Sequence, residues 1–144
     1  MIYTAQTKKA LRLCFKAHKE QTDKTGMPYV FHPFHLAEQM QDEDSVTVAL
    51  LHDVVEDTDY TLEDLRQMGF PETVIAALSL LTHDPAVPYM EYVAAIKPNP
   101  LARAVKLADL AHNSDLSRFE ADEIDDWARA RQGKYQKAIA FLQS

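Results

Sequence analysis

The sequence predicts an all-α protein of about seven or eight helices. Apolar residues recur every three or four positions along much of the chain, and proline or glycine falls where these patterns stop. No β-branched run alternates as a half-buried strand would. The length of 144 residues and a hydrophobic content of 47% suffice for one domain with a sizeable core. We therefore expect a single domain over residues 1–144.

The first part of the chain is expected to form two helices joined by a loop. Residues 4–20 place lysine and arginine between apolar positions, which is typical of an amphipathic helix with a basic outer face. Residues 21–30 contain a glycine and a proline and indicate a loop. Proline suits the first turn of a second helix over 33–40. Residues 42–45 then offer polar caps for a third helix.

This third helix, over residues 46–59, is the most unusual stretch of the sequence. It has too many apolar residues for a one-sided surface helix, so we expect packing on nearly all sides. Helical periodicity stacks His52 over Glu56, and likewise Asp53 over Asp57. Carboxylates this close repel one another and cost free energy if buried unpaired, and a bound cation removes that cost. A solvated helix end with spare acidic residues is the alternative interpretation.

Five further helices are expected in the rest of the chain. They cover residues 61–69, 71–81, 89–97, 101–116 and 124–142. Thr61 and Asp64 form a weak capping box at the start of the first. Proline opens the second helix and ends the third. The expected inner face of the last helix consists of Trp127, Ala128, Tyr135, Ile139 and Leu142.

Composition excludes several classes of function. The net charge of −7 argues against a nucleic-acid-binding surface, and no apolar run is long enough for a membrane span. With three glycines and no Gly-rich loop before a helix, phosphate-binding loops of the nucleotide-binding families are absent. The N-terminus lacks the order of a secretory signal, and the lone Cys14 suits a reducing cytoplasm. We expect a cytoplasmic protein with a small-molecule partner; nothing in the sequence indicates an oligomeric state.

Four residues are candidate ligands of one divalent cation. They are His32, His52, Asp53 and Asp109. Two imidazoles and two carboxylates suit Mn²⁺, Fe²⁺ or Zn²⁺ better than Ca²⁺, and few protein ligands leave positions open for water and substrate. A pairing of Asp109 with Lys106 or Arg103 is the alternative for that carboxylate. For His32 the alternative is a helix cap.

Three stretches of the sequence match one family in their order. They are A-H-K-E-Q-T-D-K-T-G-M-P-Y-V-F-H-P at 17–33, A-L-L-H-D-V-V-E-D-T at 49–58 with T-L-E-D-L at 61–65, and V-K-L-A-D-L-A-H-N at 105–113. Together they resemble HD-domain metal-dependent phosphohydrolases. Within that superfamily the chain resembles the hydrolase domain of the RelA/SpoT family and the stand-alone small alarmone hydrolases. The resemblance implies an HD-domain helical bundle.

The resemblance also implies an activity and roles for individual residues. Proteins of this family remove the 3′-pyrophosphate from (p)ppGpp and yield GDP or GTP with pyrophosphate. The four candidate ligands would bind Mn²⁺, and Glu56 and Asp57 would position and deprotonate the attacking water. Lys24 and Asn113 would contact the nucleotide and its phosphates.

Two positions depart from the family pattern. Asp23 and Leu110 stand where relatives carry basic residues, and a carboxylate can neither stack on guanine as a guanidinium does nor attract phosphate. The hydrolytic residues are all present, so the departures concern the substrate. A phosphohydrolase acting on another phosphorylated nucleotide is therefore the first alternative. The second is a non-catalytic metal-binding or nucleotide-binding module.

Overall fold

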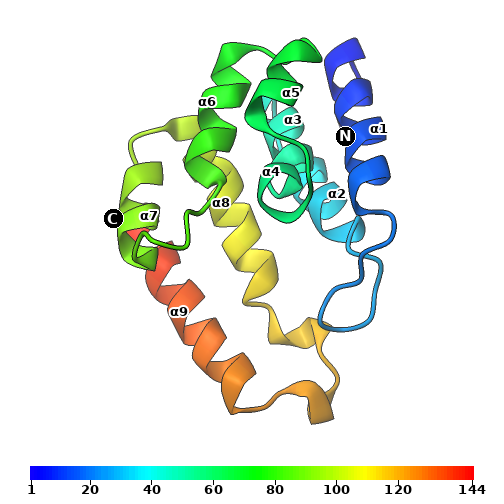
Figure 1. The fold of residues 1–144 in the computed structure, drawn as a ribbon. Helices are drawn as coiled ribbons and strands as arrows, with labels where there is room; N and C mark the ends of the chain where they lie inside the picture. The colour runs from blue at the N-terminus through cyan, green and yellow to red at the C-terminus, as the bar shows by residue number, and fades with distance from the viewer.

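Nine α-helices and two 3₁₀ helices make up the fold, and the only β-type pairing is an isolated bridge (Figure 1). The computed structural model describes residues 1–144. The helices are α1 (Ala5–His18), α2 (Phe31–Glu38), α3 (Glu43–Leu51), α4 (Val54–Asp57), α5 (Leu62–Gln67), α6 (Glu72–Leu81), α7 (Tyr89–Ile96), α8 (Pro100–Asn113), η1 (Leu116–Arg118), η2 (Ala121–Glu123) and α9 (Asp126–Gln143). The all-α prediction is confirmed.

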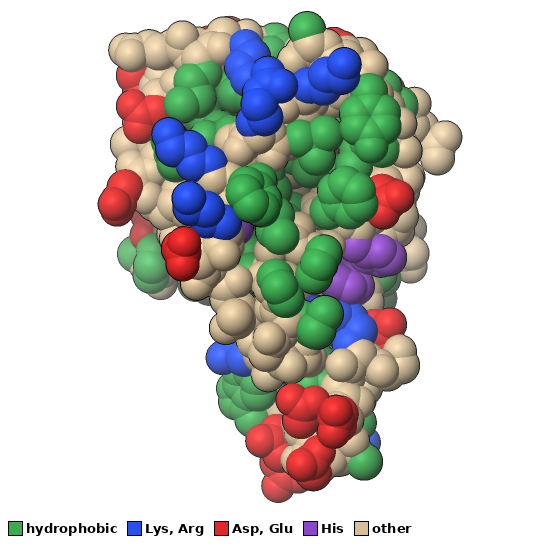
Figure 2. Space-filling view, turned by 90° about the vertical axis from the view of Figure 1, so that its right-hand side faces the viewer, with side chains coloured by type: hydrophobic (Ala, Val, Ile, Leu, Met, Phe, Trp, Pro, Cys, Tyr) green, Lys and Arg blue, Asp and Glu red, His purple; other side chains and the backbone are tan.

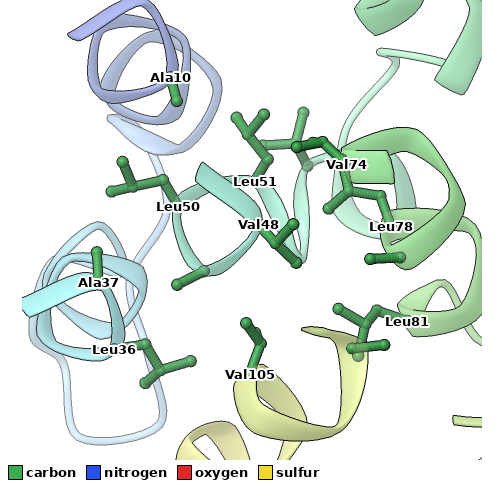
Figure 3. Packing of buried hydrophobic residues seen from close by; sticks show 14 of the residues in the cluster. Ala10, Leu36, Ala37, Val48, Leu50, Leu51, Val74, Leu78, Leu81 and Val105 are labelled. Atoms are coloured by element: carbon green, nitrogen blue, oxygen red, sulfur yellow. The ribbon is translucent and has the colours of Figure 1, made fainter. Parts of the chain in front are cut away.

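Helix α3 is the centre of the core. Every residue from Ser45 to Leu51 is buried, and α1, α2, α6 and α8 pack around it. Figure 3 shows Val48, Leu50 and Leu51 of this helix among apolar side chains of its neighbours. The prediction that this stretch packs on nearly all sides is therefore confirmed. Truncating one of these leucines to alanine typically costs about 2–5 kcal/mol.

The predicted continuous helix over 46–59 is wrong in one respect. The chain leaves the helix at His52 and Asp53 and resumes as the four-residue α4, which raises the helix count to nine. The His52 ring donates from Nδ1 to the Ala49 carbonyl at 2.7 Å. In a continuous helix that carbonyl would accept the backbone N–H of Asp53. The turn consequently brings the side chains of His52 and Asp53 to the same place.

Local sequence signals account for most helix ends. Asp42 caps α3, and Thr61 and Asp64 form the predicted capping box of α5. Gly69 follows the C-terminal cap of α5 and has a φ of +94°, a backbone conformation that residues with a side chain rarely adopt. Helix α2 begins two residues before Pro33, at Phe31. These signals set the connections that place α2, α3 and α4 around one point.

The C-terminal part differs from the prediction in two details. Helix α8 ends at Asn113 rather than near 116, and η1 and η2 connect it to α9. Trp127, expected on the inner face of the last helix, is 53% exposed. In Figure 1 the connection containing η1 and η2 lies beside the loop that joins α1 to α2. An ion pair between Asp23 and Arg118 joins these two segments.

The face of the molecule in Figure 2 has one group of basic and one group of acidic side chains. Figure 2 shows lysines and arginines near the upper edge and acidic side chains gathered at the narrow end. As predicted, Lys8, Arg12 and Lys16 of α1 are exposed. The exposed large hydrophobic residues of the first 40 positions are Tyr3, Phe15, Met27, Phe31 and Phe34. None of the helices combines the length and hydropathy of a membrane span.

Candidate functional site

The four candidate metal ligands converge although three segments of the chain supply them. His32 comes from α2, Asp109 from α8, and His52 and Asp53 from the turn between α3 and α4. One ligand atom from each of His32, His52 and Asp109 lies within 4.8 Å of the others. Asp53 Oδ2 is 3.1 Å from His52 Nε2. The geometry thus brings all four predicted residues together.

The surroundings of His52 Nε2 point to a cation at this position. Nδ1 lies 2.7 Å from the Ala49 carbonyl and donates to it, which leaves Nε2 as the ring nitrogen that can bind a metal ion. This buried Nε2 has no hydrogen-bond partner, and it faces oxygens of Asp53 at 3.1 Å and Asp109 at 3.5 Å. A lone pair against two carboxylate oxygens is repulsive unless a cation lies among them. The donor set therefore fits a divalent metal ion.

Asp109 and His32 are held in place by a second set of contacts. Asp109 Oδ1 lies 2.9 Å from His32 Nε2 and accepts the Asn113 amide at 2.8 Å, while Oδ2 accepts Lys106 Nζ at 2.8 Å. His32 Nδ1 lies 2.7 Å from Nδ1 of His112, so one ring donates to the other. Contacts of this kind fix the orientation of metal-binding side chains. The pairing of Asp109 with Lys106, which was the alternative to metal binding, is present in the structure. It occurs together with the cluster of candidate ligands and does not replace it.

The two carboxylates of the cluster have opposite pKa shifts. Burial, together with the charges of Asp109 and Asp57, holds the pKa of Asp53 well above its usual range. Burial also acts to raise the pKa of Asp109, but the Lys106 ammonium and the hydrogen bond from His32 outweigh it and hold that pKa well below the usual range. The cluster therefore carries excess negative charge, which is expected of a site that binds a cation.

Glu56 and Asp57 are exposed to solvent and lie beside the candidate metal ligands. With Asp53 they form a second group whose ligand atoms lie within 4.8 Å of one another. The backbone N–H of His83 donates to Glu56 Oε1 at 2.7 Å, and burial raises the pKa of Asp57. A carboxylate so placed can accept a proton from a neighbouring water.

A pocket of about 270 Å³ opens over these groups, and we call it the catalytic pocket. Its lining residues are Asp53, Glu56, Asp57, His83, Tyr89, Tyr92, Lys106, Asp109, Asn113, Lys134 and Tyr135. The buried hydroxyl of Tyr89 has no hydrogen-bond partner within the protein. Two lysines and this hydroxyl give the pocket groups that can receive phosphate oxygens.

A larger pocket of about 520 Å³ adjoins the first, and we call it the loop pocket. Its lining residues are Gln21, Thr22, Asp23, Lys24, Thr25, Tyr29, Asp57, Asn113, Arg118, Phe119 and Arg131. Asp57 and Asn113 line both pockets. Lys24 lies in the loop pocket with Nζ 4.9 Å from the ring of Trp127. Of the two residues expected to contact substrate, Lys24 therefore lines the loop pocket and Asn113 lines both pockets.

The two departures from the family pattern have different structural consequences. Asp23 lines the loop pocket, where its carboxylate pairs with Arg118 at 3.3 Å. Leu110 is fully buried in the core and lines neither pocket. Only the change at Asp23 can therefore act directly on a bound ligand.

Sequence reasoning missed several residues that shape the site. The Tyr29 hydroxyl donates to Asp53, and Arg118 reaches the loop pocket from η1, just after the helix expected over 101–116. His83 lines the catalytic pocket, and its backbone N–H donates to Glu56. Tyr29 directly precedes the V-F-H-P stretch and could have been suspected. No local pattern marks Arg118, because its role depends on two distant loops meeting.

The comparison with protein families decides the identity of the fold. The HD domain family matches residues 10–83, just over half of the chain. The chain belongs to the HD-domain family. This confirms the resemblance carried by the three sequence stretches, and the matched residues include His32, His52 and Asp53.

Known relatives of this chain are guanosine polyphosphate enzymes. The guanosine-3′,5′-bis(diphosphate) 3′-pyrophosphohydrolase MESH1 of Homo sapiens is 32% identical, over 91% of this chain and 79% of that protein. A GTP pyrophosphokinase of Streptomyces coelicolor is 34% identical, over 79% of this chain. The chain spans only 15–18% of the length of that enzyme and of two further relatives.

A solved structure agrees with the same family. It belongs to a metazoan ortholog of SpoT described as hydrolysing ppGpp. It superposes with a TM-score of 0.76 at 26% identity and covers 99% of this chain and 87% of its own. The HD-domain helical arrangement is therefore shared along nearly the whole chain.

Proposed function

We propose that this chain is a metal-dependent phosphohydrolase that removes the 3′-pyrophosphate from guanosine-3′,5′-bis(diphosphate). The observation that carries the proposal is the buried, unpartnered Nε2 of His52, which faces Asp53 and Asp109 beside an exposed pair of carboxylates. Family membership and the relatives that carry this activity support it. We also propose that residues 1–144 form a single domain and that this domain carries the activity.

In this proposal His32, His52, Asp53 and Asp109 bind the metal ion. The ion, when bound, lowers the pKa of a coordinated water and neutralises charge on the phosphoryl oxygens. Mixed nitrogen and oxygen ligands suit Mn²⁺, Fe²⁺ and Zn²⁺, and we propose Mn²⁺ because the family resemblance implies it. Tyr29 and Asn113 hold the two carboxylates in orientation through their hydrogen bonds.

Glu56 and Asp57 act as the base. They accept the proton of the attacking water, whose oxygen adds to the phosphorus attached to the ribose 3′-oxygen. That phosphorus–oxygen bond breaks, and the 3′-oxygen leaves with a proton as the hydroxyl of GDP, while pyrophosphate is released. Lys106 and Lys134 line the same pocket and can balance phosphate charge. Lys24 and Asn113 contact the nucleotide.

A second candidate keeps the chemistry and changes the substrate. Asp23 places a carboxylate in the loop pocket, which favours a phosphohydrolase acting on a different phosphorylated nucleotide. A purely binding module is disfavoured, because metal or nucleotide binding alone does not need the exposed carboxylate pair over the metal cluster.

The test is incubation of purified protein with ppGpp, with and without added Mn²⁺, followed by identification of the products. The proposal expects GDP and pyrophosphate, formed only with metal. A parallel screen of nucleotides phosphorylated at the 3′ or 5′ position separates the second candidate. Turnover of another nucleotide in preference to ppGpp would establish that candidate, and no turnover of any nucleotide with metal bound would overturn both.

A further inference from the structure

The ion pair between Asp23 and Arg118 is the unexplained feature of the loop pocket. Both residues line the pocket, and their side chains are 17% and 20% exposed. They come from segments 95 residues apart in the sequence. The pair joins these two segments, and its place inside a ligand-sized pocket also puts it within reach of a bound molecule.

Asp23 is fixed by its own loop and cannot turn toward a ligand. Its Oδ1 accepts the backbone N–H and the hydroxyl of Thr25, at 2.8 and 2.7 Å, and the backbone N–H of Met27 at 3.1 Å. Its Oδ2 accepts Nη2 of Arg118 at 3.3 Å. The carboxylate is therefore an orienting group whose partner is Arg118.

The guanidinium of Arg118 is planar, and its positive charge is largely balanced by Asp23. Nη1 donates to the His112 carbonyl at 2.8 Å and Nη2 donates to Asp23, so two bonds from the terminal nitrogens fix the plane of the guanidinium. The charge is balanced by the Asp23 carboxylate, which weakens attraction for a phosphate. Arg118 lines the loop pocket together with the aromatic residue Phe119. Guanidinium planes and aromatic rings are surfaces on which nucleobases stack.

The position of the loop pocket fits the nucleoside part of a substrate. Asp57 and Asn113 line both pockets, so a ligand with phosphates over the metal cluster can continue into the loop pocket. The volume of about 520 Å³ lies within the range of small-molecule sites. Lys24 and Arg131 add positive charge to the lining, and both contact Trp127, at 4.9 and 5.1 Å from its ring.

We propose that Arg118, oriented by Asp23, is the specificity-determining residue on which the nucleobase stacks in the loop pocket. This inference rests on the proposed function for its choice of a purine nucleotide. It assigns Asp23 a positioning role, so the carboxylate in the pocket becomes part of base recognition. It also separates the two pockets by task, with phosphates in the catalytic pocket and the base in the loop pocket.

The experiment measures binding of GDP and of inorganic pyrophosphate by calorimetry, in the presence of Mn²⁺, for the wild type and three variants. Arg118→Ala should weaken GDP binding about tenfold or more, the loss expected for a stacking platform, and should leave pyrophosphate binding within about twofold. Arg118→Lys keeps the charge and loses the plane, so it should resemble the alanine variant. Arg129→Ala removes an exposed arginine of α9 outside both pockets and serves as the matched control.

Each outcome decides the inference. Restoration of GDP binding by Arg118→Lys, or equal weakening of pyrophosphate, would show that Arg118 acts as a charge for phosphate and would overturn it. Unchanged GDP binding in Arg118→Ala, or no GDP binding by the wild type, would also overturn it. Thermal unfolding of each variant identifies a misfolded protein, and Arg118→Lys then carries the test. If GDP binding depends on Arg118 while ppGpp stays intact, the proposed function fails and the base pocket stands.

Discussion

The catalytic pocket and the loop pocket adjoin each other but are built in different ways. Helices supply the proposed reactive groups of the catalytic pocket, with Asp53 and Glu56 at α4 and Asp109 on α8. The loop pocket depends on the 19–30 loop and on η1, which meet through the Asp23–Arg118 pair. Chemistry that tolerates little displacement thus sits on packed helices, whereas the surface that selects a ligand sits on loops.

The largest expected effect is the loss of metal from the catalytic pocket. Asp109→Asn keeps the shape of a buried side chain and removes the charge that balances the cation. We expect loss of bound Mn²⁺ and a fall in turnover of at least about a thousandfold. Metal analysis of the purified variant together with a turnover assay checks this, and a variant that keeps both metal and activity would remove Asp109 from the ligand set.

The second effect concerns the base and should leave the metal in place. Glu56→Gln preserves the hydrogen bond from the His83 backbone and cannot accept a proton, so kcat should fall about 10²–10³-fold. Metal content should match that of the wild type. The kcat is measured with saturating ppGpp, and an unchanged kcat would transfer the role to Asp57 alone.

A smaller effect is expected from a residue that holds a ligand without touching the metal. Tyr29→Phe removes the hydroxyl that donates to Asp53. Because such supporting hydrogen bonds set ligand orientation, the affinity for Mn²⁺ should fall about 10–100-fold. A titration with a metal-sensitive dye measures it. Equal affinities in Tyr29→Phe and the wild type would mean that α3 and α4 alone hold Asp53.

The smallest effect belongs to the loop pocket. Burial acts to raise the pKa of Asp23, but hydrogen bonds from Thr25 and Met27 and the Arg118 charge outweigh it and lower that pKa. A carboxyl with a lowered folded-state pKa stabilises the fold above its unfolded pKa, and this contribution is lost as pH falls through the folded pKa. Asp23→Asn should therefore lower the free energy of unfolding by about 0.5–1 kcal/mol at pH 7 and by less below about pH 4.

Urea unfolding of the wild type and Asp23→Asn at several pH values measures this difference. A difference that stays constant from neutral to acid pH would show that the Asp23 charge contributes nothing. The same comparison for Glu20→Gln, an exposed carboxylate just before the loop pocket, gives the background.

The same contrast explains what could be predicted from the sequence. Packing of α3 follows from its apolar residues, and the convergence of His32, His52, Asp53 and Asp109 matches the predicted ligand set. The break after Leu51 was not predicted, because the bond from His52 to the Ala49 carbonyl competes with a helical pattern that is otherwise continuous. Local periodicity cannot show such competition between a side chain and the backbone.

The loop pocket could not be predicted for a different reason. Arg118 falls between the helices expected over 101–116 and 124–142, and its partner Asp23 lies far away in the sequence. Trp127 was expected on the inner face of the last helix but is exposed. Its ring makes cation–π contacts with Lys24 and Arg131. Contacts between two irregular segments leave no periodic trace in either, so only the folded chain shows them.

The central claim is that one metal ion in the His32, His52, Asp53 and Asp109 cluster drives hydrolysis in the catalytic pocket. The most direct measurement strips the protein with a chelator, adds Mn²⁺ in steps, and follows pyrophosphate release from ppGpp. The account predicts no release from stripped protein and a linear rise that ends at about one equivalent of metal per chain. Release that persists after chelation, or bound metal without release, would contradict it.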